Sequence, residues 1–157
     1  MHFVKMHGLG NDYIYVDEFL YPGPRDIAAA APRASDRHTG IGGDGLVLIQ
    51  PTDAADCRMR MFNADCSEGR MCGNGVRCVA EYLLRHGYAS GTAADVETPL
   101  VVKHIVRREL GLLTVVIGAP VRAPDKNHVT AFGNAVVNAQ VWGTGRAAPL
   151  ISLCMYN

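Results

Sequence analysis

Short apolar runs separated by polar, glycine-containing segments predict a series of strands in the first part of the chain. His2–Lys5 and Tyr13–Asp17 have the pattern of two short strands, and GLGND at 8–12 has the composition of a turn between them. LVLIQ at 46–50 is typical of a buried strand, and residues 57–62 alternate as the next strand would. We therefore expect strands to dominate this region.

Two helices are also predicted. Residues 22–34, rich in Ala and Pro, favour a short helix with loops on either side. The clearer helix runs from Val76 to Arg85, with Gly87 placed to end it. It is identified by one apolar stripe at helical spacing, formed by Val76, Val79, Ala80, Leu83 and Leu84.

The later part of the chain has a less regular pattern. Val96–Val106 and Leu112–Ile117 are predicted as strands around a turn at Gly111. Pro120 and Pro124 then interrupt the pattern, and the residues after them include glycines and strand-like segments but show no helical periodicity.

Composition narrows the function classes. The 157 residues suffice for one domain with a real core, and the 17 glycines indicate many tight turns. The formal net charge is zero and no basic run occurs, so neither nucleic acid nor a membrane surface is an expected partner. The N-terminus lacks the pattern of a signal peptide, and the apolar runs are strand-sized, so a cytoplasmic location is expected. The five cysteines include no CxxC pair, so no metal site is expected and the thiols should stay reduced.

A glycine-rich loop at 35–45 satisfies GxGxxG through Gly40, Gly42 and Gly45. A dinucleotide-binding motif follows a strand and opens a helix, whereas here a polar loop comes first and an apolar strand comes after it. The loop therefore indicates a turn that needs positive φ angles.

The segment MCGNG at 71–75 carries the main chemical candidate, Cys72. Gly73 and Gly75 would leave backbone N–H groups unobstructed at the start of the helix, where the helix dipole favours anions and carboxylates. A thiolate is favoured at the same place. Cys72 is thus either a reactive thiol beside a carboxylate-binding site or a small buried residue in a tight turn.

Two asparagines lie in turn-like segments, Asn11 in GLGND and Asn63 in FNAD. Asparagine is a common turn residue, so each could be purely structural. If the strands that they flank are neighbours, the two side chains and the Cys72 loop would form a polar pocket.

Several separated motifs together resemble the N-terminal half of the diaminopimelate epimerase family, from Met1 to about Pro120. They are KMHGLGNDYIYVD, DRHTGIGGDGLVLI, MFNADCSEGRMCGNGVRC and VETP, in this order. The resemblance implies an α+β fold whose half is a curved, mostly antiparallel sheet wrapped around a central helix. It also implies a homodimer as a possible assembly of the full-length protein.

The family resemblance implies a reaction as well, the interconversion of LL- and meso-diaminopimelate for lysine and peptidoglycan synthesis. No pyridoxal phosphate or metal takes part, so the expected cofactor is none and the expected partner is a small amino-acid substrate. Two cysteines on opposite faces of the α-carbon exchange protons with it, one as thiolate and one as thiol. Backbone N–H groups at helix ends stabilise the developing charge on the substrate carboxylate.

Carried over by motif, Cys72 matches the first catalytic cysteine, and Gly73 and Asn74 match the backbone donors to the carboxylate. Asn11 and Asn63 match substrate-contacting asparagines. Gly45 stands where some family members have a substrate-contacting glutamine, so one polar contact is expected to be missing or replaced by water.

The last part of the chain departs from the family pattern. FGNAVV at 132–137 and WGTGRAA at 142–148 only partly match the family's GNPH and CGTG motifs, and Trp142 stands in the place of the second cysteine. We therefore expect an epimerase-like domain at 1–120 and an incomplete or aberrant start of a second domain at 121–157. The alternative function is a catalytically inactive fragment that at most binds a carboxylate ligand.

Overall fold

The computed structural model describes residues 1–116, 136–144 and 150–156. Its helices are α1 (Ile27–Ser35), α2 (Gly73–His86) and the short 3-10 helix Glu109–Gly111. Its strands are β1 (Val4–Gly8), β2 (Asn11–Asp17), β3 (Gly45–Gln50), β4 (Cys57–Asn63), β5 (Glu68–Gly69), β6 (Ala93–Glu97), β7 (Val102–Arg107), β8 (Leu112–Val116), β9 (Val136–Thr144) and β10 (Leu150–Tyr156).

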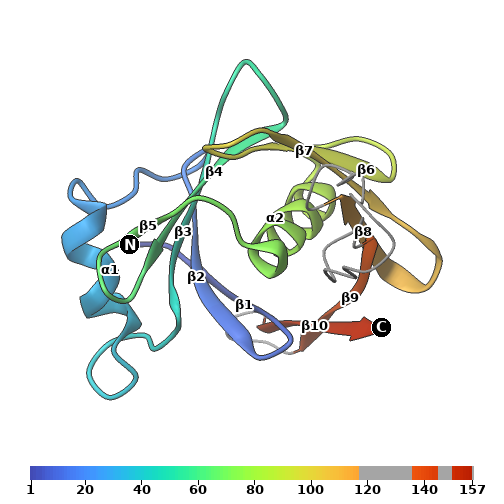
Figure 1. The fold of residues 1–157 in the computed structure, drawn as a ribbon. Coiled ribbons are helices and arrows are strands. Elements are labelled where there is room, and N and C mark those ends of the chain that lie inside the picture. The colour runs from blue at the N-terminus through green and yellow to red at the C-terminus, as the bar shows by residue number, and fades with distance from the viewer. Residues whose placement is uncertain (117–135, 145–149, 157) are drawn as a thin grey trace, which may run out of the picture.

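The strands form one 10-stranded sheet that curves around α2, with α1 on the outer side (Figure 1). The order is β3-β2-β1-β10-β9-β8-β7-β6-β4-β5, and an additional β3–β4 pairing closes it into a ring. Most pairings are antiparallel, and the pairs β1–β10, β2–β3 and β4–β6 are parallel. The predicted α+β fold, a curved and mostly antiparallel sheet around a central helix, is confirmed.

The first two strands form a hairpin whose turn is shorter than expected. Leu9 and Gly10 both have positive φ, 54° and 82°, and Gly8 pairs directly with Asn11. Two central residues with positive φ are typical of the tight hairpin turns that match strand twist. Asn11 is therefore the first residue of β2, and β1 begins two residues later and ends three residues later than the predicted strand at 2–5.

The buried run at 46–49 is apolar throughout because both of its faces are covered. Leu46 and Leu48 pack in the cluster that contains Ala31 of α1, whereas Val47 and Ile49 pack in the larger cluster around α2. The pleat of the strand sends alternate side chains to opposite faces, so neither face can be polar.

The central helix α2 is the one predicted from the apolar stripe, and it begins three residues earlier. Cys72 is its N-cap, with Sγ accepting a hydrogen bond from the N–H of Gly75. Gly87 ends the helix in the left-handed conformation with φ 76°, as predicted. The outer helix α1 occupies only part of the predicted range 22–34 and begins after the N-cap Asp26.

The single strand predicted at Val96–Val106 is wrong, because two strands and a tight turn occupy this region. β6 ends at Glu97, which pairs with Val102 at the start of β7. Between them the Thr98 hydroxyl donates to the carbonyl of Val101 at 2.7 Å, and the Thr98 and Val101 backbones are also bonded. Pro99 has no N–H for a sheet, which is the signal that predicts a turn here.

Residues 136–144 and 150–156 bring two strands into the same sheet. β9 pairs with β8, and β10 pairs with β9 and, in parallel, with β1. The predicted domain boundary between 120 and 121 lies outside the described residues and stays a prediction.

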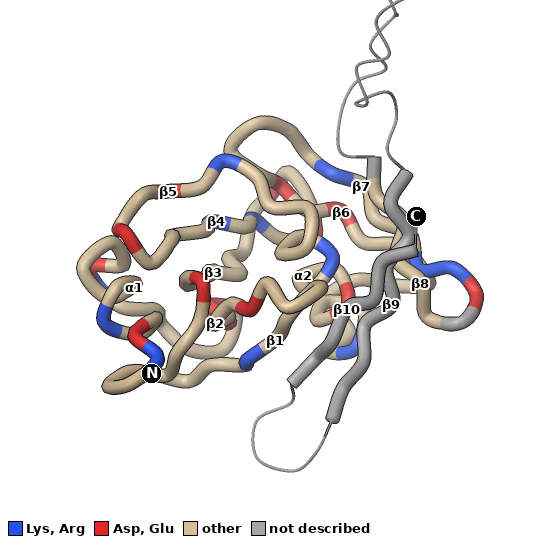
Figure 2. Tube along the Cα trace, turned by 60° about the horizontal axis from the view of Figure 1, so that its bottom comes forward, with Lys and Arg blue, Asp and Glu red and all other residues tan. Residues whose placement is uncertain are grey.

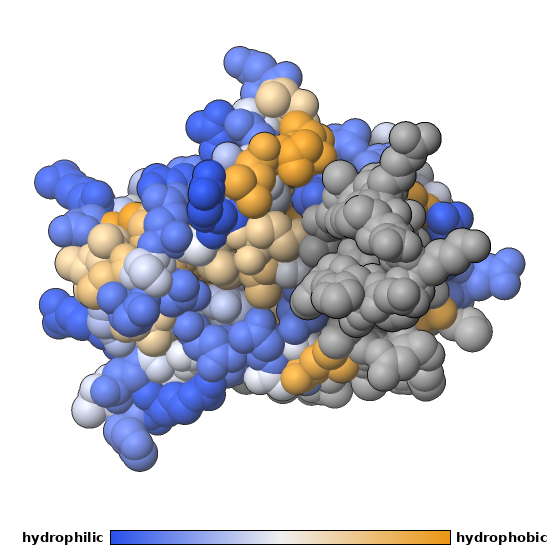
Figure 3. Space-filling view, viewed as in Figure 1, coloured by the Kyte–Doolittle hydropathy of each residue, from blue (hydrophilic) through white to orange (hydrophobic). Residues whose placement is uncertain are grey.

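The surface carries charges of both signs. Lys and Arg positions are interspersed with Asp and Glu positions along the described chain (Figure 2). Apolar side chains are exposed in several places (Figure 3), among them Leu100, Val101 and Val102 at the β6–β7 turn. Among the described helices, none is long and apolar enough to cross a membrane.

Candidate active site

Three strand ends and the N-terminus of α2 carry the predicted site residues. Asn11 begins β2, Gly45 begins β3, and Asn63 ends β4. Tyr13 pairs with Gly45, and Gly45 pairs with Asn63, so β3 lies between the two strands that bear the asparagines. These strand ends therefore share one edge of the sheet.

Cys72 is half-buried at the start of α2, and its sulfur is hydrogen-bonded to Gly75 and Asn11. Sγ accepts from the Gly75 N–H at 3.2 Å, and the thiol donates to Asn11 Oδ1 at 3.5 Å. The N–H groups of Gly73 and Asn74 have no acceptor in the part of the chain that the structure describes. They are the unpaired first-turn donors of a helix, the kind of group that binds a carboxylate.

Asp44 holds Asn11 from the other side, and sequence reasoning missed this residue. Asn11 Nδ2 donates to Asp44 Oδ2 at 2.8 Å, and the same oxygen accepts from the Asp12 N–H at 3.0 Å. Arg37 donates to Asp44 Oδ1 at 2.9 Å and to both carboxylate oxygens of Asp12. No local pattern indicates this contact, because Asn11 and Asp44 lie 33 residues apart.

This environment lowers the pKa of Asp12 and raises the pKa of Tyr13. Partial burial by itself raises the pKa of Asp12, but hydrogen bonds from Arg37 and Lys5 outweigh it and lower the pKa to about 2. Burial, together with the charge of a Cys72 thiolate, raises the pKa of Tyr13 to about 12. At neutral pH Asp12 is thus a carboxylate and Tyr13 a neutral phenol.

Asn63 lies at the same sheet edge but does not contact Asn11 or Cys72. Its Nδ2 donates to Ser67 Oγ at 2.9 Å, and its backbone N–H donates to the Ser67 carbonyl. Asn63 therefore stabilises the turn at 64–67 in this structure.

Gly45 has no space for a side chain. A Cβ at this position would lie 2.2 Å from the Phe62 carbonyl oxygen and 2.8 Å from the Tyr13 ring. The close approach of β4 and Tyr13 therefore requires glycine here. It leaves no room for the glutamine that some family members have at this position. The neighbouring Gly42 has φ 83°, which fits the turn predicted for this loop, and the loop leads into β3 instead of a helix.

Arg77 is a second site neighbour that the sequence did not reveal. It is 1% exposed, and its Nη1 donates to the Gly73 carbonyl at 2.6 Å, directly below the first turn of α2. Burial lowers its pKa to about 10, so it stays positively charged at neutral pH. This charge adds to the helix dipole in favouring an anion near the N-terminus of α2.

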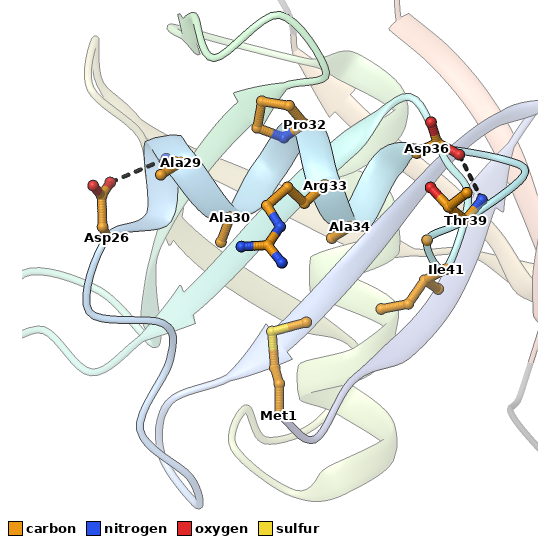
Figure 4. Close-up of a pocket in the computed structure, with 11 residues that line it drawn as sticks. Met1, Asp26, Ala29, Ala30, Pro32, Arg33, Ala34, Asp36, Thr39 and Ile41 are labelled. Carbon is orange, nitrogen blue, oxygen red and sulfur yellow. Dashed lines mark hydrogen bonds between the residues drawn. The ribbon is translucent and has the colours of Figure 1, made fainter.

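A cavity of about 950 Å³ lies away from this site, between α1, Met1 and the loop at 36–41 (Figure 4). Ala29, Ala30 and Ala34 line it, and it contains none of the predicted site residues. Its two carboxylates already cap backbone N–H groups, Asp26 that of Ala29 and Asp36 that of Thr39. Both carboxylates thus stabilise local backbone structure, and the α2 N-terminus remains the candidate site.

Comparison with known proteins identifies the family of the chain. The family model for diaminopimelate epimerase matches residues 3–121. A diaminopimelate epimerase from Agathobacter rectalis is 45% identical over 140 residues, which cover 86% of this chain and 49% of that protein. The chain spans about half the length, or less, of this and two other curated relatives that it matches.

Solved structures show the same fold at low sequence identity. A PhzF-family phenazine biosynthesis protein from Bacillus anthracis has a TM-score of 0.53 and 20% identity, covering 73% of this chain and 40% of that chain. A probable proline racemase from Agrobacterium radiobacter K84 has a TM-score of 0.54 and 14% identity, covering 88% and 48%. On the extent of the family match and the identity to its curated members, the chain belongs to the diaminopimelate epimerase family.

Proposed function

We propose that this chain provides the first half of a cofactor-independent epimerase site that interconverts LL- and meso-diaminopimelate. The observation that carries the proposal is the position of Cys72 at the N-terminus of α2. Its sulfur lies beside the unpaired N–H groups of Gly73 and Asn74, so a bound carboxylate would bring its α-carbon close to the thiol.

The weak acidity of the substrate's α-carbon determines what the site must provide. A carbon beside an ionised carboxylate is a weak acid, and the charge that develops on the carboxylate must be stabilised as the proton leaves. Preorganised backbone donors are suited to this, since one such donor is typically worth about 3 kcal/mol in the transition state. Arg77, buried below the same turn, adds positive charge.

Cys72 supplies one of the two proton carriers that inversion requires. A base on one face of the α-carbon removes the proton, and an acid on the opposite face must deliver another. Asn11 Oδ1 accepts a hydrogen bond from the Cys72 thiol, and the Gly75 N–H donates one to its sulfur, so the site can stabilise either protonation state. The second carrier would come from a second half that this chain only partly matches.

A second candidate function is a carboxylate-binding fragment that does not turn over its ligand. The chain covers 49% of the Agathobacter rectalis relative, and Trp142 stands where the family motif places its second cysteine. An indole cannot exchange a proton at carbon in the way that a thiol does. The two functions differ in one observable, isotope exchange at the α-carbon.

The test is to incubate the chain with LL-diaminopimelate in D₂O and to follow deuterium entry and meso product together. The matched control is Cys72→Ser, because serine is a good N-cap and preserves α2 while removing the thiol. We expect deuterium entry that falls at least about 100-fold in the control, the usual contribution of a general base. Deuterated meso product would require a second proton donor and would exclude the inactive fragment.

Deuterium entry without meso product would support Cys72 as a base that acts on one face alone. If the folded chain exchanges no deuterium, the epimerase proposal for this chain is wrong. Binding of the substrate measured by calorimetry would then decide whether the carboxylate-binding fragment is correct.

A further inference from the structure

We propose that Asp44 is a positioning residue that fixes the amide of Asn11 and thereby sets how tightly Cys72 holds its proton. The importance of this effect for catalysis rests on the proposed function, whereas the effect on the Cys72 proton does not. It is carried by two consecutive contacts, Asp44 Oδ2 to Asn11 Nδ2 at 2.8 Å and Asn11 Oδ1 to Cys72 Sγ at 3.5 Å.

The orientation of the Asn11 amide is determined by the chemistry of its partner. A carboxylate only accepts hydrogen bonds, so the amide must present its NH₂ group to Asp44 and its oxygen to Cys72. The opposite orientation would place the amide oxygen against the carboxylate and lose a charge-assisted hydrogen bond.

The Asp44 carboxylate is itself held on both oxygens. Oδ2 also accepts from the Asp12 N–H at 3.0 Å, and Oδ1 accepts from Arg37 at 2.9 Å. The Asp44 backbone N–H donates to the Asp12 carbonyl at 2.6 Å, which ties the loop before β3 to β2. The carboxylate therefore cannot turn away without breaking several bonds.

The consequence for Cys72 depends on the direction of each hydrogen bond. Asn11 Oδ1 can accept the proton of a thiol but repels a thiolate, so this contact favours the protonated sulfur. Gly75 N–H donates to the sulfur and favours the thiolate. If the amide of Asn11 turned over, both neighbours would favour the thiolate and the proton would be held less tightly.

The other titratable groups facing Cys72 keep a constant charge near neutral pH. They are Tyr13 and Tyr15 on β2 and Arg77 and Cys78 on α2. Burial raises the pKa of Tyr13 and of Cys78 to about 12 and raises the pKa of Tyr15 well above its ordinary value, while Arg77, with a pKa of about 10, stays a cation. A change in Cys72 on altering Asp44 would therefore not come from their titration.

The test measures the rate at which iodoacetamide alkylates Cys72 in the full chain, by peptide mass spectrometry. In Asp44→Asn the amide of Asn11 is free to turn, and we expect alkylation at about pH 7 to be about tenfold faster, the factor for one hydrogen bond of ordinary net strength. The ratio of rates at about pH 7 and about pH 10 separates the thiolate fraction from access to the sulfur, since free thiols are largely ionised at the higher pH.

Removing the Asp44 charge also favours a thiolate, so the charge effect must be separated from the amide effect. In an Asn11→Ala background only the charge effect remains, and Asp44→Asn is expected to accelerate alkylation by no more than about threefold. Asp12→Asn is the matched control, because it neutralises a carboxylate of the same network that has no side-chain contact with Asn11. Equal acceleration by Asp44→Asn in both backgrounds would overturn the proposal.

This assay needs no turnover, so it separates the inference from the proposed epimerase activity. If Asp44→Asn does not fold, as judged by circular dichroism, the unaltered chain supplies the test by NMR. An NOE from the Asn11 side-chain NH₂ to the Asp12 amide proton is then expected. An NOE from that NH₂ to the Cys72 β-protons in its place would show the opposite amide orientation and contradict the proposal.

Discussion

At the scale of single residues, the pleat at the start of β2 turns neighbouring side chains with different roles to opposite faces of the strand. Asn11 and Tyr13 face α2 and the Cys72 sulfur, while Asp12 between them faces Lys5 and Arg37. Alternate residues of a strand point to opposite faces, so adjacent positions can take unrelated roles. Asp12 can therefore be altered without removing a neighbour of the thiol.

We expect Asp12 to make the protein sensitive to acid in a defined pH range. Its folded pKa of about 2 lies below the ordinary value of 3.8, so the folded state favours the carboxylate. The stabilisation is fully present above about pH 4 and is lost as the pH falls through about 2. Urea unfolding at several pH values should show a decline over this range that is smaller in Asp12→Asn.

The same Asp12→Asn variant should be about 1–2 kcal/mol less stable than the unaltered chain at neutral pH, because Lys5 is left without its carboxylate partner. Asp53→Asn serves as the control, since Asp53 is exposed. If the two variants show the same acid dependence, Asp12 is not the group responsible.

At the scale of elements, the buried carboxylate of Glu81 ties α2 to the sheet. Glu81 is 4% exposed and accepts from Arg85 on the same helix at 2.6 Å. Its other oxygen accepts twice from Arg107 of β7, at 2.6 Å and 3.0 Å. The contact fixes the C-terminal half of α2 on the sheet, while Cys72 and its neighbours occupy the N-terminal end.

Glu81→Gln is expected to lower the free energy of unfolding by about 2 kcal/mol, because two guanidinium groups lose a buried charge partner. Glu68→Gln is the matched control. It also removes a carboxylate that accepts two hydrogen bonds from an arginine, Arg60, but this pair lies at the surface. Exposed pairs are worth at most about 1 kcal/mol, so equal losses in urea unfolding would contradict the proposed role of Glu81.

The elements show what local sequence determines and what it does not. The apolar stripe and Gly87 were sufficient to predict α2, because helix periodicity and the left-handed stop are properties of neighbouring residues. The turn at Thr98–Val101 was missed although Pro99 signals it, because apolar residues on both sides extended the strand pattern.

The residues of the candidate site likewise include some that local sequence predicts and some that it does not. Cys72 at a helix N-terminus was predictable from the adjacent glycines, and Asn11 from its family motif, and the structure brings these two together. Asp44 and Arg77 could not be predicted, because their roles depend on the β2–β3 pairing and on the depth at which α2 is buried. Neither feature has a signal within one segment of the sequence.

At the scale of the whole molecule, closure of the sheet depends on the segment that departs most from the family pattern. β10 lies between β9 and β1, and β9 joins it to β8. Without these two strands, β1 and β8 would be open edges, and an open edge exposes unpaired backbone groups and promotes aggregation. The predicted start of a second domain at 121–157 and the observed pairing of β9 and β10 with the first sheet therefore lead to different expectations about stability.

Ile151→Pro tests these expectations in the full chain. Ile151 pairs with Met6 of β1 and with Gly143 of β9, so it lies between two neighbouring strands, where proline removes a backbone donor and disrupts the ladder. If β10 closes the ring, the variant should lose about 2–3 kcal/mol of unfolding free energy in urea, whereas Ile151→Val, which retains the donor, should lose less than about 1 kcal/mol. Circular dichroism would follow both variants. Unchanged stability in the proline variant would show that the first 116 residues hold together without β10, and it would favour the interpretation of 121–157 as the start of a separate domain.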